Sequence, residues 1–309
     1  MPDPGFIAPT LATLVDEPVD GDGWIFERKL DGIRLVVVRD GDDVRLWSRN
    51  EKDRTDRYPE IAAAVRSQPC DRFVADGEVV AFDGDVTSFA RLQRSDGRRF
   101  LYLFDVMQIG DTDLRPGPLR DRKARLRSTI DFADPLRFCI HRNGGDGVGR
   151  SWLTEACRKG WEGLIAKRAD SAYRSGRSRD WLKLKCVAQQ ELVIGGYTEP
   201  KGSRTGFGAL LVGYHDGEVL RFAGRVGTGF GDEELSRLSA ALADRERPGS
   251  PFDDAPGGAG VHWVSPDLVC EVGFTEWTTA GRLRHPRFLG LRDDKPADRV
   301  VRETPGTAS

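Results

Sequence analysis

The chain has 309 residues, and its 47 basic and 49 acidic residues give a formal net charge of −2 at pH 7. That length is sufficient for two domains of ordinary size whose cores need neither disulfides nor metals. The near-neutral charge excludes binding to nucleic acid through overall charge, so any such site must be a local concentration of Arg and Lys.

The cysteines and the N-terminal residues bear on the cellular compartment. The cysteines stand singly, with no C-x-x-C pair that could bind zinc, at positions 70, 139, 157, 186 and 270. We expect them to be small buried hydrophobic residues in a reducing compartment. No export signal is visible, and the longest aliphatic run is LVVV at 35–38, far shorter than a membrane span. These features predict a cytoplasmic protein that makes no contact with membranes.

Residues 24–187 alternate short β-rich runs with helical patterns. Two strands flank the turn Asp40-Gly41, which is a strong hairpin signal, and a helix follows with Tyr58, Ile61 and Val65 at helical spacing. The other elements expected up to residue 187 are strands at 72–82 and 99–107, helices at 119–130 and 151–160, and strands at 162–168 and 181–187. This mixture predicts an α+β unit.

After residue 188 the pattern changes to short strands separated by glycines, with one helix over 232–243. That helix carries Leu235, Leu238 and Leu242 on a single face. About five strands and a loop rich in Pro and Gly suit a small barrel of the OB type. We place the domain boundary near 187–190.

Lysine is rare among the basic residues, with nine lysines against 38 arginines. Arginine stays protonated in proteins, whereas a buried lysine can lose its proton and act as a nucleophile. Lys29 and Asp31 stand between aromatic residues and the apolar run IRLVVV, where a core strand has no use for charge. The pattern indicates a chemical role for Lys29.

A second pair of lysines lies in the strand expected at 181–187. Strand periodicity places Lys183 and Lys185 on one face, with Cys186 and the neighbouring leucines on the other. Two ammonium groups about 6.6 Å apart repel, which favours an anion between them; a solvated edge strand is the alternative. Residues 158–186 hold nine basic and three acidic side chains, a local concentration that suits nucleic acid but also occurs on solvated faces.

Carboxylates and aromatic residues interrupt or accompany other apolar strands. Glu78 lies in ADGEVVAF and Glu162 precedes GLIAKR, and each buried carboxylate needs a partner, which a salt bridge with an arginine would also supply. Phe100, Tyr102 and Phe104 alternate onto one face, where they form either core or a platform for base stacking.

In chain order these motifs are K-x-D-G-x-R at 29–34, S-R-N at 48–50, D-G-E at 76–78, F-D-V at 104–106, E-G at 162–163, K-x-K at 183–185 and R-D-D-K at 292–295. They closely resemble the motifs of covalent nucleotidyltransferases, which are DNA ligases, RNA ligases and mRNA capping enzymes. The segments FIAPTLATLVDEP, WIFERKLDGIR, LWSRNEKDRTDRYPEI and WTTAGRLRHPRFLGLRDDK resemble the ligase module of bacterial DNA ligase D, an end-joining enzyme. The resemblance covers nearly the whole chain.

The resemblance implies an adenylation (nucleotidyltransferase) domain of antiparallel sheets with flanking helices over residues 1–188, a C-terminal OB-fold β-barrel over 189–302 and a disordered tail at 303–309. It implies ATP-dependent sealing of nicked or broken double-stranded DNA through a lysyl-AMP and a DNA-adenylate. ATP is then the AMP donor and Mg²⁺ or Mn²⁺ the metal. The implied process is repair of double-strand breaks by end joining, with Ku and polymerase or nuclease partners, and we expect a monomer associated with the nucleoid.

The resemblance also implies roles around the reacting phosphate. Lys29 is expected to attack the α-phosphate of ATP, and Lys183 and Lys185 to hold that phosphate. Nearby positive charge would lower the pKa of Lys29 and help its amine to lose a proton. Asp31 and Glu162 match the positions that bind the metal.

Further residues are implied to hold the nucleotide and the DNA. Phe104 is expected to stack on adenine, Arg34 and Glu78 to hold the ribose and its surroundings, and Glu27 to contact the nucleotide. Arg49 is expected to bind the 5′-phosphate of the nick.

The C-terminal motif implies a conformational step. Arg292 and Lys295 are expected to orient the leaving pyrophosphate when the OB domain closes about a hinge near 187–190. Glu51 follows S-R-N at a position where related ligases commonly have glycine, which leaves room for a different course of the loop around Arg49.

Other functions fit the sequence less well. An NAD-dependent ligase is disfavoured because that class carries a four-cysteine zinc module, and the block GRLRHPRFLGLRDDK argues against a capping guanylyltransferase. An RNA ligase, or a module that binds nicks and DNA ends without catalysis, stays open as an alternative. The intact set of Lys29, Glu162, Lys183 and Lys185 argues against lost catalysis.

Overall fold

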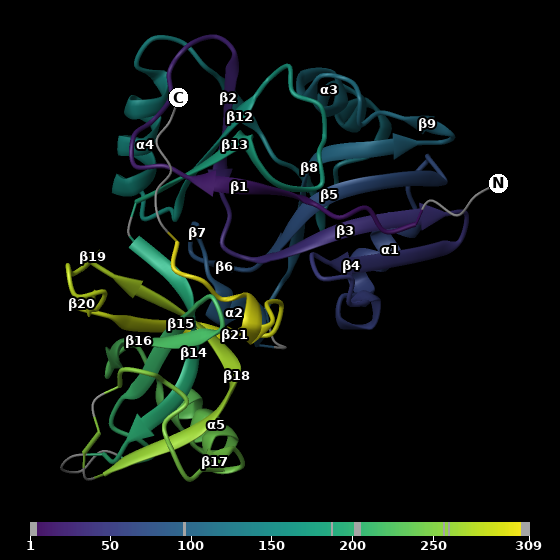
Figure 1. The fold of residues 1–309 in the computed structure, drawn as a ribbon. Coiled ribbons are helices and arrows are strands. Elements are labelled where there is room, and N and C mark those ends of the chain that lie inside the picture. Colours follow the sequence, from purple (N-terminus) through teal and green to yellow (C-terminus); the bar gives the residue numbers. More distant parts are fainter. Residues whose placement is uncertain are drawn as a thin grey trace. The chain divides into compact units, whose positions relative to one another are not determined.

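The computed structural model describes residues 5–94, 97–186, 188–200, 205–255, 257–258 and 260–303. The chain forms two compact units that divide between Cys186 and residue 187 (Figure 1). In the described residues, the first unit contains two large sheets and the second contains one, and each unit also has a two-stranded sheet. Of the tail expected at 303–309, all but Glu303 lies outside the described residues.

The first sheet has the strand order β1-β13-β12-β2-β11, with the bounds Thr10–Leu14, Gly176–Lys185, Gly163–Arg168, Trp24–Lys29 and His141–Asn143 in that order. β1 runs parallel to β13, and the other pairs are antiparallel. The helix α4 (Val148–Arg158) lies along β2, β12 and β13 (Figure 1). It packs Trp152 and Ala156 against one face of the sheet, and strand alternation places Lys29, Lys183 and Lys185 on the other face.

The two ends of α4 differ in how well the sequence predicts them. The helix begins at Val148, before the predicted start at Ser151, because Gly147 takes a left-handed conformation (φ 69°) that turns the chain into the helix. At the other end Gly160 is left-handed as well (φ 70°), and the predicted stop at this glycine is confirmed.

The second sheet has the order β10-β8-β5-β3-β4, with the bounds Leu136–Phe138, Phe100–Ile109, Arg72–Val80, Ile33–Asp40 and Asp43–Ser48, and β9 (Thr112–Asp113) pairs with β8. The predicted hairpin is confirmed as β3 and β4. The helices α1 (Pro59–Arg66) and α3 (Leu119–Thr129) bury Ile61 and Leu126 in the core that covers one face of this sheet. Short elements connect the strands: η1 (Thr55–Arg57), β6 (Phe82–Asp83), β7 (Val86–Thr87) and α2 (Phe89–Gln93).

The other faces of the two sheets meet. Val36 of β3 and Phe104 of β8 belong to one apolar cluster with Trp181 of β13, and the ring centroids of Phe104 and Trp181 are 6.0 Å apart. Lys29 and Lys183 of the first sheet and Arg34 and Glu78 of the second lie on the two faces that meet here.

The second unit has the sheet order β16-β15-β14-β18-β17, with β21 also paired to β18. The bounds are Val219–Val226, Leu210–Asp216, Ala188–Thr198, Val261–Phe274, Glu246–Arg247 and, for β21, Arg287–Arg292. Its other elements are α5 (Asp232–Ala243), the hairpin of β19 (Glu276–Trp277) and β20 (Leu283–Arg284), and η2 (Ala297–Arg299). The leucine face predicted for α5 is confirmed, because Leu235, Leu238 and Leu242 are buried in the core.

The expected closed barrel is not formed by the strand pairings of the described residues. The ladder ends at β16 on one side and at β17 and β21 on the other. One hydrogen bond, from the Phe288 amide to the Thr228 carbonyl at 2.9 Å, links β21 to the segment after β16. The unit is therefore an OB-type sheet with an incomplete ring of ladder hydrogen bonds.

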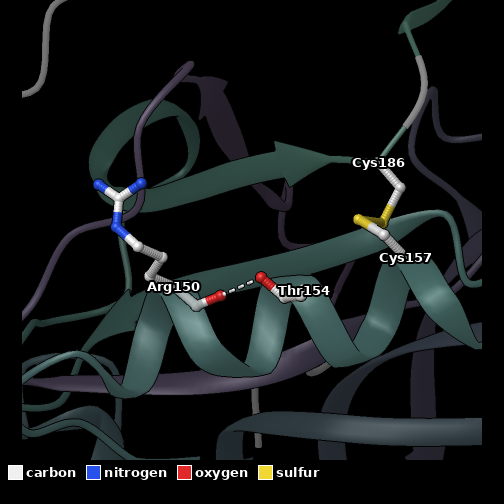
Figure 2. Close-up of a disulfide and its surroundings, with 4 residues drawn as sticks. All are labelled: Arg150, Thr154, Cys157 and Cys186. Carbon is white, nitrogen blue, oxygen red and sulfur yellow. Dashed lines mark hydrogen bonds between the residues drawn. A yellow bond between two sulfur atoms is a disulfide. The ribbon is translucent and has the colours of Figure 1, made fainter.

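The expectation that the cysteines are small buried hydrophobic residues in a reducing compartment is wrong for the exposed Cys157 and for its partner Cys186. Cys157 at the end of α4 and Cys186 directly after β13 form a disulfide, with their Cα atoms 5.1 Å apart (Figure 2). α4 leads into β12, and β12 pairs with β13, so two positions separated by 29 residues become neighbours. Cys70, Cys139 and Cys270 are free thiols.

Candidate functional site

The candidate nucleophile lies where three strands converge. Lys29 is the last residue of β2, and its register partner on β12 is Gly163, which also pairs with Lys185 of β13. Glu162 immediately precedes Gly163, and its carboxylate forms an ion pair with the Lys29 ammonium group. The structure therefore brings together Lys29, Glu162 and the strand end that carries Lys185.

Two glycines make this convergence possible. A Cβ on Gly163 would lie 1.9 Å from the carbonyl oxygen of Leu184, and a Cβ on Gly32 would lie 2.2 Å from that of Val79. Both contacts are with backbone atoms, which cannot move without breaking strand pairing. The glycines of the E-G and K-x-D-G motifs are thus required by close packing of the chain next to the site.

Lys183 and Lys185 lie on the predicted common face of β13. Leu182 and Leu184 are buried against α4 on the other face. Ile165 of β12 is the register partner of Lys183. The two lysines therefore share a face with Lys29, as a site for an anionic phosphate requires.

Arg34 of β3 and Glu78 of β5 are register partners on the second sheet. The Arg34 guanidinium binds both carboxylate oxygens of Asp76, at 2.5 and 2.7 Å, and the Tyr173 hydroxyl donates to the same carboxylate at 2.6 Å. Burial opposes the charge of Arg34, but Asp76 outweighs this effect and raises the pKa of the guanidinium. Asp76 is a site residue that sequence reasoning missed, although its place two residues before Glu78 puts both carboxylates on one face.

Phe104 is held in a closely packed environment. Phe104 is 6% exposed, and the Arg34 guanidinium carbon lies 4.5 Å from the centroid of its ring. The Lys167 ammonium lies 4.2 Å from the same centroid and 3.8 Å from that of Trp181. Because cations already lie against this ring, its stacking on adenine stays a prediction.

Glu27 is the centre of a buried charge cluster. The residue is 2% exposed, and its carboxylate accepts from the ammonium groups of Lys123 and Lys167, each at 2.6 Å. Burial alone would raise the pKa of Glu27, but the two lysines outweigh burial and lower that pKa below its ordinary value. Lys123 also donates to the carbonyl oxygens of Phe104 and Cys139, at 3.3 and 3.0 Å.

The contact of Glu27 with the nucleotide stays a prediction. Its carboxylate is engaged within the protein, two residues before Lys29, and Lys123 ties it to the backbone of β8. Sequence reasoning missed Lys123 and Lys167. Their only signal was that both belong to the nine lysines of an arginine-rich chain.

Asp31 follows β2 and contacts the start of α2. Its carboxylate accepts from the Phe89 amide at 3.3 Å, and its own amide donates to the Thr87 hydroxyl at 3.2 Å. Within the described parts of the chain, no group of three or more His, Cys, Asp or Glu side chains is arranged to hold a metal. Mg²⁺ commonly uses one or two carboxylates together with substrate phosphates, and the binding of a metal by Asp31 and Glu162 stays a prediction.

Arg49 follows β4 in a turn that is closed by the Glu51 amide, which donates to the Ser48 carbonyl at 3.0 Å. Glu51 itself has a φ of +56°, the left-handed region that favours glycine. The position thus keeps the backbone conformation typical of glycine although the residue is a glutamate. Its side chain does not prevent the turn that presents Arg49.

In the second unit, Arg292 and Lys295 both form ion pairs. The Arg292 guanidinium binds Glu271 at 2.8 Å and Asp294 at 2.9 Å, and the Lys295 ammonium binds Glu191 at 2.8 Å. These contacts all lie within the unit and hold the strand β21 and its end in place. The part of both residues in orienting pyrophosphate stays a prediction.

The comparisons with known proteins agree with this site. The ATP dependent DNA ligase domain matches residues 9–185, and the ATP dependent DNA ligase C terminal region matches residues 203–295. The multifunctional non-homologous end joining protein LigD of Pseudomonas aeruginosa is 42% identical over 98% of this chain and 37% of its own length. The LigD protein of Mycobacterium tuberculosis H37Rv is 40% identical over 96% of this chain and 40% of its own length. The chain therefore spans less than half of these relatives.

Solved structures give the same result. A mycobacterial DNA ligase D complexed with ATP and MES has a TM-score of 0.71 and 36% sequence identity, and the match covers 96% of this chain and 98% of that chain. The ligase domain of M. tuberculosis LigD has a TM-score of 0.54 and 37% identity, and the match covers 96% of this chain and 98% of that chain.

Among the described residues, no helix has the length and apolar sequence needed to cross a membrane.

Family matches of this extent, over most of the chain, show to which family it belongs. The nucleotide of the family is ATP, a divalent metal is its general requirement, and its fold is a nucleotidyltransferase domain followed by an OB domain. The chain belongs to the ATP-dependent DNA ligases.

Proposed function

We propose that this chain seals nicks and broken ends in double-stranded DNA through an adenylate on Lys29. The observation that carries the proposal is the convergence of Lys29, Glu162 and the end of β13 at Gly163. A lysine in contact with a carboxylate, on the same sheet face as two further lysines, is the arrangement that a nucleophilic amine and an anionic substrate need.

In the first step the Nζ atom of Lys29 attacks the α-phosphorus of ATP, the bond to the oxygen that bridges to the β-phosphate breaks, and pyrophosphate leaves. Lys29 must first give up a proton, and Glu162 is the carboxylate in contact with its ammonium group. Lys183 and Lys185 offset the negative charge on the phosphate oxygens. A divalent metal near Asp31 and Glu162 would supply further positive charge to the phosphates.

The second sheet holds the nucleoside in this proposal. Arg34 is fixed by Asp76, so its guanidinium has a single orientation beside its register partner Glu78. A fixed cation next to a carboxylate offers both a donor and an acceptor to the ribose hydroxyl groups. The charge cluster of Glu27, Lys123 and Lys167 adjoins Arg34, because Lys167 and Arg34 both lie against the ring of Phe104.

The last two steps act on DNA. AMP passes from Lys29 to a 5′-phosphate, which we propose is bound by Arg49, and the 3′-hydroxyl then attacks that phosphate and releases AMP. Splitting the condensation into covalent steps lowers each barrier. The curated relatives are named as non-homologous end joining proteins, which supports a role in joining double-strand ends. We propose that the chain acts there as a monomer, with a DNA-end-binding partner such as Ku.

Nick sealing with two DNA substrates tests the proposed nucleophile. Lys29→Arg keeps the positive charge but removes the nucleophile, so we expect sealing of a 5′-phosphate nick with ATP to fall by at least about 1,000-fold. The same variant should still seal a nick that already carries AMP on its 5′-phosphate, because that reaction does not use Lys29.

Lys52→Arg is the matched control, because Lys52 is an exposed lysine of the same unit, and it should seal both substrates at the wild-type rate. Sealing of the unadenylated nick by Lys29→Arg at an undiminished rate would show that the nucleophile lies elsewhere.

A further inference from the structure

Cys157 and Cys186 are the two cysteines that the fold brings together. Cys157 lies one turn after Thr154, whose hydroxyl donates to the Arg150 carbonyl at 3.0 Å within α4, and it reaches from the end of the helix to Cys186 (Figure 2). The residue Cys157 is exposed and Cys186 is half-buried. Small thiols and disulfides in solution therefore have access to this pair.

The pair adjoins the candidate site through the backbone. The Cys186 amide donates to the Glu162 carbonyl at 3.0 Å, and Cys186 directly follows Lys185. Gly163, the residue after Glu162, is the register partner of both Lys29 and Lys185. Cys186 is thus one residue from Lys185 and hydrogen-bonded to Glu162, the ion-pair partner of Lys29.

The disulfide closes a loop that contains much of the site. The 29-residue separation between the two cysteines includes Glu162, the strand β12, and the strand β13 with Lys183 and Lys185. Closing such a loop restricts the alternative conformations of the enclosed chain. The chain enters the second unit directly after Cys186, so without the disulfide this end of β13 is held by strand pairing and by apolar packing of Cys186 under α4.

Two of the free thiols, Cys139 and Cys270, are excluded from the same chemistry by burial. Burial raises the pKa of Cys139 to about 12 and raises that of Cys270 as well, so both stay protonated and enclosed. Cys157 and Cys186 are instead joined to each other in the structure and reachable from solution, as exchange with a small disulfide requires.

We propose that Cys157 and Cys186 are a reversible thiol–disulfide modification site that controls the rate of Lys29 adenylation, an inference that rests on the proposed function. Small disulfides are the oxidants. A thiolate of the pair attacks the disulfide and releases one small thiol, and the second thiolate then attacks the mixed disulfide and releases another. Two protein thiols and one small disulfide thus become one protein disulfide and two small thiols. The disulfide form holds Glu162 and Lys185 beside Lys29 and adenylates faster.

The test uses the full chain equilibrated with defined ratios of reduced and oxidised glutathione. The form that contains the disulfide is about 2 Da lighter than the reduced form because two hydrogen atoms are lost, and intact-mass measurement gives the fraction of each. Single-turnover formation of the AMP adduct from ATP is then measured at each ratio. We expect the adenylation rate of the reduced wild type to be about one fifth of the rate of the disulfide form.

Three variants refine the result. Cys157→Ser and Cys186→Ser should each adenylate at the rate of the reduced wild type, whatever the glutathione ratio. Cys70→Ser removes a cysteine outside the pair and should respond to the ratio as the wild type does. Since the wild type alone supplies both forms, a variant that fails to fold does not decide the outcome.

Equal adenylation rates for the reduced and disulfide forms would overturn the inference, as would a wild type that forms no disulfide at any glutathione ratio. These outcomes differ from failure of the proposed function. If neither form accepts AMP, Lys29 adenylation itself is wrong, whereas equal and rapid adenylation of both forms contradicts only the redox control.

Discussion

Single residues decide whether the strands can converge at Lys29. Gly163 and Gly32 bring two backbones closer than any side chain permits, and Glu162 supplies the partner of the nucleophile. The sequence predicted Lys29, Glu162 and the shared face of Lys183 and Lys185 from charges that a core strand does not use. It could not predict which carboxylate pairs with which cation, because those partners lie on distant strands.

Glu51 offers a test of backbone strain at this scale. Its φ of +56° costs a non-glycine residue about 1–2 kcal/mol in the folded state. Glycine removes this strain, but it also raises the entropy of the unfolded chain, which offsets part of the gain in stability. We expect Glu51→Gly to leave the free energy of unfolding unchanged or to raise it by up to about 1 kcal/mol. Glu51→Val should lower it, because a β-branched residue is poorly tolerated in this region. Urea denaturation measures both effects.

The same exchange inside a helix is the control. Glu60 lies in the first turn of α1, and Glu60→Gly should lower the free energy of unfolding by about 1 kcal/mol. If Glu51→Gly destabilises as much as Glu60→Gly, the turn after β4 is not left-handed in solution.

At the scale of elements, pattern and turn chemistry predicted much of what the structure contains. The hairpin at Asp40-Gly41, the helix over 119–130 and the leucine face of α5 follow from local sequence, and the structure confirms them. The strand β1 was not predicted, because it is short and obtains its hydrogen bonds from β13, more than 160 residues later. The disulfide was missed for a similar reason, although the alternation of β13 placed Cys186 on the face that α4 covers.

The buried cluster of Glu27 joins three elements, β2, β12 and α3, and it makes stability depend on pH. The folded-state pKa of Glu27 is lowered, so its contribution is fully present above the ordinary glutamate pKa of about 4.5 and is lost as the pH falls through the lower folded-state value. We expect urea denaturation from pH 7 to pH 3 to show this loss in the wild type.

Lys123→Met removes one of the two cations that lower this pKa. We expect it to reduce the free energy of unfolding at pH 7 by about 3–5 kcal/mol and to weaken the dependence on acidic pH. Lys159→Met is the control, because Lys159 forms an exposed pair with Glu155 in α4 that contributes about 0.5 kcal/mol or less. A wild type and a Lys123→Met variant with the same stability would contradict the arrangement of the cluster.

At the scale of the whole molecule, the chain has two units that each complete their own core. Arg292 and Lys295 are bound to carboxylates of their own unit, so any action on pyrophosphate needs them to exchange these partners. The motif order predicted the ligase family from the sequence, since it samples strands of both sheets and of the second unit. The incomplete barrel was not predicted, because a motif order does not state which edge strands pair.

The central claim is a single covalent bond between Lys29 and AMP. Intact-mass measurement of the purified chain, incubated with ATP and a divalent cation, should show one added AMP, and peptide mapping should place it on Lys29. Lys29→Arg should show no adduct, and GTP should give none with the wild type. An adduct that persists in Lys29→Arg, or labelling by GTP without labelling by ATP, would contradict the account.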